Sequence, residues 1–511
     1  MMQAKSKHIK SINKISTLTF IIFLTLFSSV SAITYEDKTY FSKRPEGEDL
    51  PLEISMQNYV FENNKHILKG LLQATPFAEF SQQSSKLAHY LLMVDSKDSL
   101  SVGRSCDIDN RYIKFNETSS THLTGEISIS PKIETFGIYL SYHQPLTALS
   151  DKLLLRINFP IVNTRCNPRF NIDNGTQSST GNKRIEDYFN GEVMFSGYES
   201  GTTILRIMQE ALAYGKINRK TVTKTSLADI NLELNRRLLR TGNFLFNINF
   251  FATLPTNSPP TAEWILEPTI GTSGHWALGL GIDGCCTINQ YVQFIYDVRY
   301  KYLLAANERR ILGLKNKSDQ KLTLGQYTLF GEIDAPRVTP AANALAQRVK
   351  VAPRSRVECL AMLSYNQNGA MLQLGYNLWG KQKDKVRMSN VWNNTQYAFA
   401  GSDFLTYIEK ILSSNTNIQA QADFDLADSN IDNIISQMYP SGTTGYVTDS
   451  QLDYDTASSP AVFSQKIFLA LGYNWGNTSQ YYLGAGGSVE FPTNNSRLRQ
   501  LGFWIKCGFL F

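Results

Sequence analysis

The sequence is short of charge, of histidine and of cysteine, and each shortage narrows what the protein can be. Charged residues make up 18% of its 511 residues, against about 25% in an average soluble protein. The six histidines are scattered, and none lies in an HExxH motif or beside a GxSxG elbow. The six cysteines do not have the CxxC-type spacing of metal sites. We therefore expect no enzyme, no metal site and no cofactor.

Long apolar runs are also absent after residue 32, so a spanning helix, which needs 18 or more such residues, is not expected there. Before that point the chain has a basic stretch with Lys5 and Lys14, the apolar run "FIIFLTLF" and the small-residue sequence "VSA" ending at Ala32. This order predicts a secretory signal peptide over residues 1–32. An uncleaved membrane anchor is the alternative, which the short run and the cleavage pattern disfavour.

Removal of the leader changes the charge of the chain. The leader holds four lysines and no acidic residue, so the net charge falls from +6 to +2. No basic stripe remains, which argues against nucleic acid as a partner.

Alternation of apolar and polar residues is what the sequence has in abundance. "NFLFNINFFATL", "KIFLALGYNW" and "QYYLGAGGSVEF" each place apolar residues at every second position. Such period-two runs indicate strands, and these span roughly nine to thirteen residues, whereas soluble strands average about five or six. A tilted strand needs about nine to eleven residues to cross a bilayer, so strand length favours a membrane protein.

The two faces of these strands differ in a way that predicts their surroundings. One face carries Leu, Ile, Val and aromatic residues, and the other carries Gly, Asn, Ser and charges of both signs. Lipid outside and a polar lumen inside would produce this pattern. We therefore predict an all-β fold, a closed antiparallel transmembrane β-barrel of roughly fourteen to sixteen strands, plus or minus two, over residues 121–511. A secreted β-sandwich or β-helix is the alternative, and would need a second sheet to cover the apolar faces.

Aromatic residues gather near the predicted strand ends, as the two girdles of such barrels require. They are Tyr300, Tyr302, Trp379, Tyr473, Trp475 and Tyr481.

Two regions do not read as simple barrel strands. Residues 33–120 are mixed, and are predicted to be a periplasmic or lumen-filling segment that can hold one or two early strands. Residues 402–460 form the longest loop, with helical spacing in "SDFLTYIEKIL" and "NIDNIISQM". A loop of this size is a lid, a constriction or a receptor site, or only a packed cap. Barrels of this type put short turns on the periplasmic side and long loops outside. With the expected strands, two long connections would lie on the periplasmic side, which predicts one more strand between residues 380 and 462.

Charged residues on the polar faces are the candidate functional residues, because they would line the lumen. In a wide barrel they bias the passage of ions, and in a narrow one they pair into a network that fills the lumen. Both signs are present, so no strong selectivity is predicted. The candidates are Asp229, Glu233, Arg237, Asp297, Arg299, Lys301, Glu490 and Lys506.

The final stretch, "FWIKCGFLF", places Phe503, Ile505, Cys507, Phe509 and Phe511 on one face at period two. It resembles the insertion signal of Gram-negative outer-membrane β-barrel proteins, whose last strand is read by the barrel-assembly machinery. The resemblance is to the class and to no particular porin family. It implies a barrel-closing strand, contact with outer-membrane lipid, and a location in the bacterial outer membrane after cleavage near Ala32.

Together these features predict a porin-like channel, monomeric or oligomeric, for passive diffusion of small hydrophilic solutes. The alternative is a surface-exposed structural or adhesin-type barrel that binds a partner through its long loops. An outer-membrane enzyme is a weaker alternative. Ser141 and His143 lie two residues apart, and we interpret them as a polar pair rather than as a nucleophile and its base.

Overall fold

The computed structural model describes most of the chain beyond the predicted leader. The described residues are 36–57, 70–82, 84–92, 99–103, 106–109, 113, 123–176, 183–194, 208–217, 219–315, 321–322, 324–332, 337–399, 446–475 and 481–511. They belong to the second of two compact units, which cover residues 1–34 and 35–511. No helix within these described stretches is both long enough and apolar enough to span a membrane.

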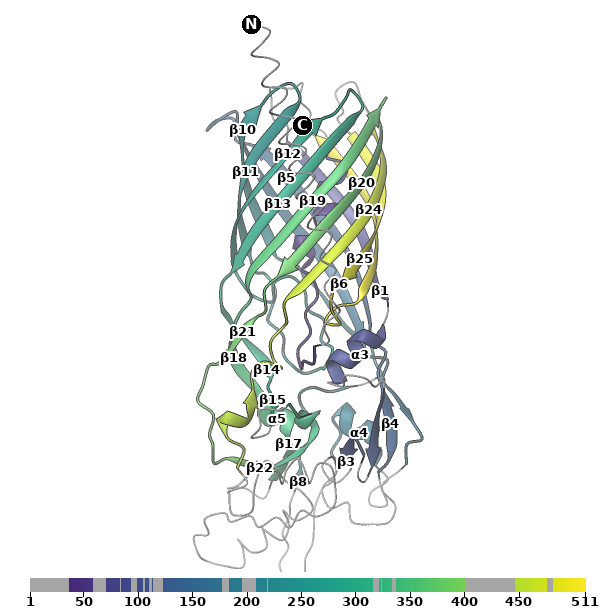
Figure 1. Cartoon of the computed structure of the whole chain (residues 1–511), viewed down its shortest axis with the longest axis vertical. Coiled ribbons are helices and arrows are strands. Elements are labelled where there is room, and N and C mark those ends of the chain that lie inside the picture. Colours follow the sequence, from purple (N-terminus) through teal and green to yellow (C-terminus); the bar gives the residue numbers. More distant parts are fainter. Residues whose placement is uncertain are drawn as a thin grey trace, which may run out of the picture. The chain divides into compact units, whose positions relative to one another are not determined.

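Twelve antiparallel strands form a closed ring (Figure 1). In ring order they are β1 (Leu71–Gln82), β5 (Lys132–Pro145), β6 (Leu153–Asn167), β10 (Ile230–Arg240), β11 (Phe244–Leu254), β12 (Ala277–Thr287), β13 (Val292–Leu303), β19 (Arg354–Gln367), β20 (Ala370–Lys381), β24 (Val462–Trp475), β25 (Tyr481–Pro492) and β26 (Arg499–Leu510). The ring closes where β26 pairs with β1, in a register that sets Leu71 opposite Leu510. Closure leaves no unpaired sheet edge, which is the condition for a sheet to lie in lipid.

The ring strands are 11 to 15 residues long, enough for a tilted crossing of a bilayer. If the elements outside the ring are left out, strands that are consecutive in the chain are also neighbours in the ring. Where β6 runs past its pairing with β10, it pairs instead with β9 (Val222–Leu227).

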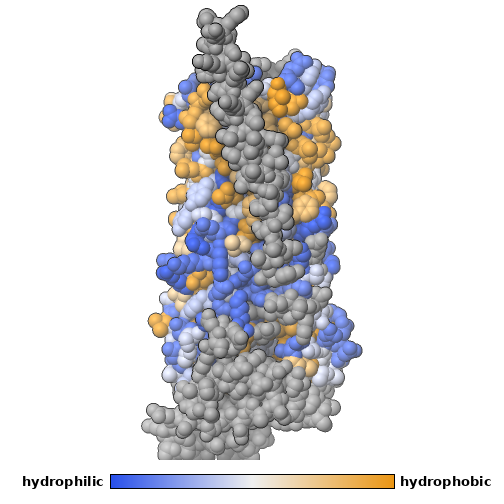
Figure 2. All heavy atoms as spheres, in the orientation of Figure 1, coloured by the Kyte–Doolittle hydropathy of each residue, from blue (hydrophilic) through white to orange (hydrophobic). Residues whose placement is uncertain are grey.

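The two faces of the ring are opposite in character to those of a soluble sheet. Large apolar side chains are exposed on the outside, among them Leu278, Leu280, Ile282, Leu372, Leu374, Ile467, Leu469 and Leu471. Polar side chains are buried on the inside, among them Asn158, Asn235, Asn249, Asp283, Gln373 and Asn377. Figure 2 shows apolar residues gathered over the part of the molecule that the barrel forms. Because a soluble monomer rarely exposes so large an apolar surface, this arrangement excludes the β-sandwich and identifies a lipid-facing wall.

The last strand has the two faces that its sequence predicts. Phe503, Ile505, Phe509 and Phe511 are exposed on the outer face, while Lys506 is buried inside. β26 is paired on both sides, with β25 and with β1. The terminal residue continues this pairing, because Phe511 and Gly70 exchange two main-chain hydrogen bonds of 2.9 and 3.1 Å.

The connections at the two ends of the ring differ in length. At the end that holds Phe511, which we call the turn end, the described connections are short: 146–152, 241–243, 288–291 and 368–369. At the other end, which we call the cap end, they include 168–229, 255–276, 304–353 and 382–461. In barrels of this type short turns face the periplasm and long loops face outward. The cap end is therefore the outer end.

Short elements of these long connections form the cap, with small sheets of their own. Its helices are α3 (Ser84–Leu92), α4 (Ile185–Asn190), η4 (Gly325–Tyr327), α5 (Ala341–Leu345) and η5 (Asp449–Gln451). Its strands are β2 (Ser99–Gly103), β3 (Ile108–Asp109), β4 (Gly125–Ser128), β7 (Asn171–Asp173), β8 (Met208–Gln209), β14 (Ala306–Ile311), β15 (Gly313–Leu314), β16 (Leu329–Glu332), β17 (Arg337–Pro340), β18 (Ala346–Ala352), β21 (Lys385–Met388), β22 (Tyr397–Phe399) and β23 (Leu452–Asp453). An apolar core holds these elements together, with the rings of Tyr188, Phe189 and Tyr327 in edge contact at its centre.

The structure makes the fold expected from sequence more exact. The ring has twelve strands, the lower limit of the expected fourteen to sixteen plus or minus two, because β9, β14, β18 and β21 alternate but lie outside it. The barrel begins at β1 rather than near residue 121, and β1 lies within residues 33–120, where one or two early strands were allowed. The strand expected between residues 380 and 462 is not among the described residues of the ring, because β20 pairs directly with β24. The helical pieces expected over residues 402–440 lie outside the described residues.

The lipid-facing wall predicts how the barrel tolerates charge. Leu280 lies near the middle of β12 with its side chain exposed on the outer face. Leu280→Arg should lower the free energy of unfolding in lipid vesicles by about 2–4 kcal/mol, because the guanidinium then faces hydrocarbon. Denaturant unfolding followed by tryptophan fluorescence measures this. Val391→Arg, at a 97% exposed cap position, is the control and should change the unfolding free energy by less than about 0.5 kcal/mol. Equal effects of the two substitutions would contradict a lipid-facing wall.

Candidate functional site: the barrel lumen and its plug

The lumen contains a segment of the chain itself, residues 36–57, which we call the plug. It holds two short helical pieces, η1 (Glu46–Glu48) and α2 (Leu50–Ile54). Asp49 caps α2 by accepting a hydrogen bond of 3.4 Å from the Leu52 main-chain nitrogen, and Pro51 lies in the first turn, where its missing N–H costs nothing. Helices this short are unstable alone in water, so the barrel wall must hold the plug in its shape.

The plug runs from the cap end of the lumen to the turn end. At the cap end the main-chain nitrogen of Glu36 donates to Asn495 Oδ1 at 2.8 Å. At the turn end Gln57 Nε2 donates to Gln73 Oε1 at 2.8 Å, three positions from Gly70, which pairs with the last residue of the chain. The plug therefore crosses the lumen along its whole length.

Two cations of the plug, Lys43 and Arg44, bind to polar groups of the barrel wall. Lys43 Nζ donates to Thr135 Oγ1 at 3.0 Å and to Thr164 Oγ1 at 2.8 Å. Arg44 forms an ion pair with Glu358 and donates to Asn377 Oδ1 at 2.8 Å. Strands β5, β6, β19 and β20 thus all contact the plug through hydrogen-bonding side chains.

The carboxylates of the plug bind to cations of the wall. Glu48 pairs with Arg356 at 3.0 Å and accepts a hydrogen bond of 2.9 Å from the indole Nε1 of Trp379. Asp49 pairs with Lys466 at 2.5 Å. All of these side chains are buried or nearly so, which makes the pairs far less screened than surface pairs.

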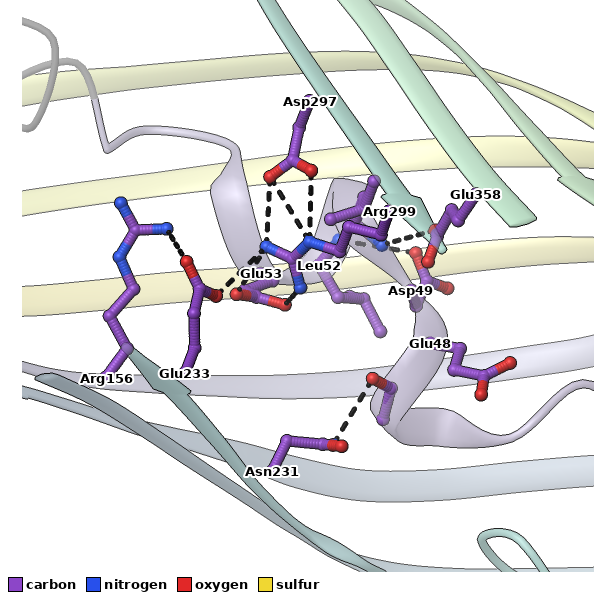
Figure 3. A network of polar contacts seen from close by, with 12 residues as sticks. Glu48, Asp49, Leu52, Glu53, Arg156, Asn231, Glu233, Asp297, Arg299 and Glu358 are labelled. Atoms are coloured by element: carbon purple, nitrogen blue, oxygen red, sulfur yellow. Dashed lines mark hydrogen bonds and ion pairs between the residues drawn. The ribbon is translucent and has the colours of Figure 1, made fainter. Parts of the chain in front are cut away.

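Glu53 joins the plug to a network within the wall (Figure 3). Its carboxylate receives two hydrogen bonds from the Arg299 guanidinium, at 2.8 and 2.9 Å. Arg299 also pairs with Asp297 at 3.0 Å and with Glu233 at 3.5 Å, and Glu233 pairs with Arg156 at 2.7 Å. One guanidinium therefore serves three carboxylates, one of them on the plug.

Beyond α2 the wall is shaped to accept the plug. A Cβ atom on Gly484 would lie 3.0 Å from Met56 Cγ, and one on Gly472 would lie 2.7 Å from Met56 Sδ. Side chains at either position would collide with the plug, so these glycines leave the space that Met56 fills. Lys506 donates to the main-chain oxygens of Glu53 and Ser55 at 3.0 and 2.7 Å.

A second ionic cluster holds the plug at the cap. The guanidinium of Arg310 lies over the ring of Tyr40, 3.6 Å from its centroid, and pairs with Glu308 at 2.8 Å and Asp384 at 3.1 Å. Burial alone would raise the pKa of Asp384, but the positive charges of Lys381 and Arg310 lower it to about 2. The cluster therefore stays ionised at neutral pH and clamps the plug under the cap.

The structure brings most of the predicted lumen residues together. Seven are buried inside the barrel: Asp229, Glu233, Asp297, Arg299, Lys301, Glu490 and Lys506. Arg237 is only partly buried, near the turn end of β10. Asp229 differs from the other six in its position, because it lies just before β10 rather than within a ring strand. It accepts a hydrogen bond of 2.5 Å from the Thr272 main-chain nitrogen. In this structure the lumen charges pair into a network that fills the barrel.

Several residues of the site were not among the predicted ones. Arg156 and Glu358 alternate with outward residues at period two, so the pattern that found the other lumen residues also applies to them. Trp379 was predicted for a lipid-facing girdle, which is wrong, because it is buried in the lumen against Glu48. The plug has no periodic pattern that would place it inside a barrel.

Comparisons with known proteins find no matching family model and no matching curated protein. The chain is similar to the COG4313 outer membrane channel from Pseudomonas putida F1 at 8% identity and a TM-score of 0.37, covering 92% of this chain and 100% of that one. It is similar to the translocator domain of the autotransporter NalP from Neisseria meningitidis at 7% identity and a TM-score of 0.30, covering 90% and 93%. Its similarity to the NanC porin has 7% identity and a TM-score of 0.26, covering 73% and 93%.

The closed ring with an apolar outside and a polar inside decides the class. The chain is an outer-membrane-type β-barrel. The plug occupies the space that a solute would have to cross. Among the described residues there is no cluster of acidic, histidine and cysteine side chains fit to hold a metal ion.

The ion pairs of the plug predict a large effect of removing one partner. Lys466 lies between Asp49 at 2.5 Å, Glu490 at 3.3 Å and Glu79 at 3.6 Å. Lys466→Met should lower the free energy of unfolding by about 3–5 kcal/mol, because it leaves buried carboxylates without a counter-charge. The double variant with Asp49→Asn should recover part of that loss. Denaturant unfolding in lipid vesicles measures both variants.

The control for this prediction is an exposed pair on the cap. Lys183 and Glu192 lie 3.0 Å apart, with side chains that are 30% and 53% exposed. Lys183→Met should change the unfolding free energy by only about 0–1 kcal/mol. If Lys466→Met were as mild as Lys183→Met, the plug would not be held by ion pairs.

Proposed function

We propose that the protein is a gated channel for small hydrophilic solutes in the bacterial outer membrane, closed by its own plug. The observation that supports this is the way the plug is held. Glu48, Asp49 and Glu53 bind the wall through buried ion pairs. Water and dissolved ions can replace such contacts. The plug also packs against the wall through four buried apolar side chains, which release would expose: Leu50, Leu52, Ile54 and Met56.

The size of the ring also supports a channel. A barrel of eight strands is filled by its own side chains, and barrels of sixteen to eighteen strands leave an aqueous channel. Twelve strands lie between these limits, and here the interior has room for a whole segment of main chain as well as side chains. Withdrawal of that segment would leave a polar passage.

This proposal modifies the passive channel expected from the sequence. Passive diffusion applies only when the plug has left the lumen. Solutes, lipid and the barrel-assembly machinery remain the proposed partners, and export with cleavage near Ala32 remains the proposed route to the membrane. Catalysis forms no part of the proposal, since Ser141 and His143 are both buried among the inward-facing residues of β5.

A second candidate function rests on the cap. Its elements share an apolar core of their own, so the described parts of the long connections form a folded surface. A structural or adhesin-type barrel would use this surface to bind a partner and would keep its lumen closed at all times. Removal of the plug separates the two candidates.

We expect the wild-type protein to conduct rarely in planar bilayers and a variant lacking residues 43–57 to conduct continuously. A variant with Glu48→Gln, Asp49→Asn and Glu53→Gln should open more often than wild type, because each weakened pair favours release. A loss of about 1.4 kcal/mol raises the open-to-closed ratio about tenfold. The matched control neutralises three exposed or partly exposed carboxylates of the cap, Glu192, Glu263 and Glu332, and should conduct like wild type.

Heat-modifiable migration on denaturing gels shows whether each variant has formed its barrel. A folded deletion variant that carries no current would overturn the channel and favour the structural barrel. Equal conductance of wild type and deletion variant would overturn the plug as gate.

A reversible covalent lock tests the gate directly. An added Cβ on Gly47 would lie 3.5 Å from Asn231 Cγ, and Asn231 already donates to the Gly47 main-chain oxygen at 3.3 Å. Gly47→Cys with Asn231→Cys therefore places two thiols at disulfide distance. Added to the three-carboxylate variant, the oxidised pair should abolish openings, and dithiothreitol should restore them. The single cysteine variants are the controls. Unchanged openings in a fully cross-linked sample would show that the plug does not gate.

A further inference from the structure

The plug carries more negative than positive charge. Residues 43–57 contain two cations, Lys43 and Arg44, against four carboxylates, a net charge of −2. The wall around the plug must compensate this charge, because unpaired buried charges are strongly unfavourable. The distribution of the compensating cations shows which sign of charge a solute should carry to bind in the empty lumen.

Four cations from four strands contact the plug along the lumen. Arg356 of β19 binds Glu48, Lys466 of β24 binds Asp49, Arg299 of β13 binds Glu53, and Lys506 of β26 binds main-chain oxygens. These cations would lose partners if the plug left.

The wall carboxylates depend less on the plug. Glu233 is paired with Arg156, Asp297 with Arg299, and Glu490 with Lys466. These partners belong to the wall and would stay. Glu358 and Glu490 would both lose Arg44 of the plug. Glu490 keeps Lys466, and Asn377 Nδ2 still donates to Glu358 at 3.0 Å. Withdrawal of the plug therefore exposes mainly positive charge.

An independent observation lies at the cap end of the lumen. Arg497 lies in the turn between β25 and β26, and only 6% of its surface is exposed. Its guanidinium carbon lies over the ring of Trp379, 4.2 Å from the ring centroid. Its Nε and Nη2 have no hydrogen-bond partner among the described residues. A guanidinium stacked on an indole keeps its planar edge free, and that edge matches a carboxylate.

We propose that the solutes of this channel are small organic carboxylates, and that the plug carboxylates occupy the positions that solute carboxylates take during passage. Arg497 and Arg356 bind the solute at the cap end, and Lys466, Arg299 and Lys506 carry it toward the turn end. The inference rests on the proposed gating function and adds the class of solute. The plug and the solute then compete for the same cations.

The test uses the variant lacking residues 43–57 in planar bilayers. Across a potassium chloride gradient, the reversal potential should show preference for chloride over potassium. Succinate should reduce the chloride current in a saturable way, while glucose should not. Replacing Arg356 and Arg497 by glutamine should weaken both effects. The matched control replaces Lys183 and Arg219, cations on the cap surface, and should leave both effects unchanged.

The outcomes separate the two proposals. A conducting pore that prefers cations, or one that ignores succinate, would overturn the solute class while the gating function stands. A folded barrel that stays silent after deletion would overturn the channel and the solute class together. If the glutamine variants fail to fold, the reversal potential and the succinate response of the deletion variant still decide.

Competition gives a further readout in the full-length protein. Succinate should raise the fraction of time that the wild-type channel is open, because it binds cations that otherwise hold the plug. Glucose at the same concentration should not. If succinate lowered the open fraction of wild type, the plug and the solute would not share these cations.

Discussion

The contact between Glu53 and Arg299 is the interaction on which the arrangement of the lumen depends. Arg299 binds the plug through Glu53 and the wall through Asp297 and Glu233. Through Glu233 the network continues to Arg156 and from there to Asp283. A guanidinium has enough donors in a fixed plane to serve several carboxylates at once. The plug is thus one member of a network that also connects strands β6, β10, β12 and β13, so its position and the charge balance of the wall are set together.

The need for such a network follows from the closed ring. Lipid outside requires apolar residues at every second position, and the alternation then places the polar residues inside. A ring of twelve strands is wider than the eight-stranded barrels that side chains alone can fill. In this barrel a segment of the same chain occupies the additional space, and it supplies both counter-charges and main-chain groups. Alternation thus explains why the lumen is polar, and the plug explains how its charges are paired.

Much of this could be predicted from the sequence, because alternation is a local property. Strand length, the outward face of β26 and the inward position of Asp297 and Arg299 all follow from period two. Strand number could not be predicted, because β14 and β18 alternate as ring strands do but pair with each other in the cap. For residues 33–120 the sequence left two roles open, periplasmic or lumen-filling, and it could not show which residues would enter the lumen. "KRPEGEDLPLE" has no strand pattern, and its place in the lumen depends on partners such as Glu358 and Lys466 that lie more than 300 residues away in sequence.

Because the plug and the wall belong to one chain, they meet at a high effective concentration. Intramolecular partners joined by short connections experience concentrations of about millimolar, and a free solute must compete against that advantage. The lumen can therefore remain closed even if each ion pair contributes only a small binding free energy. The clamp of Arg310 on Tyr40 and the bond from Glu36 to Asn495 keep the outer end of the plug under the cap. Release of the inner part alone would free Arg299, Lys466 and Lys506 while the anchored outer end holds the plug close enough to return.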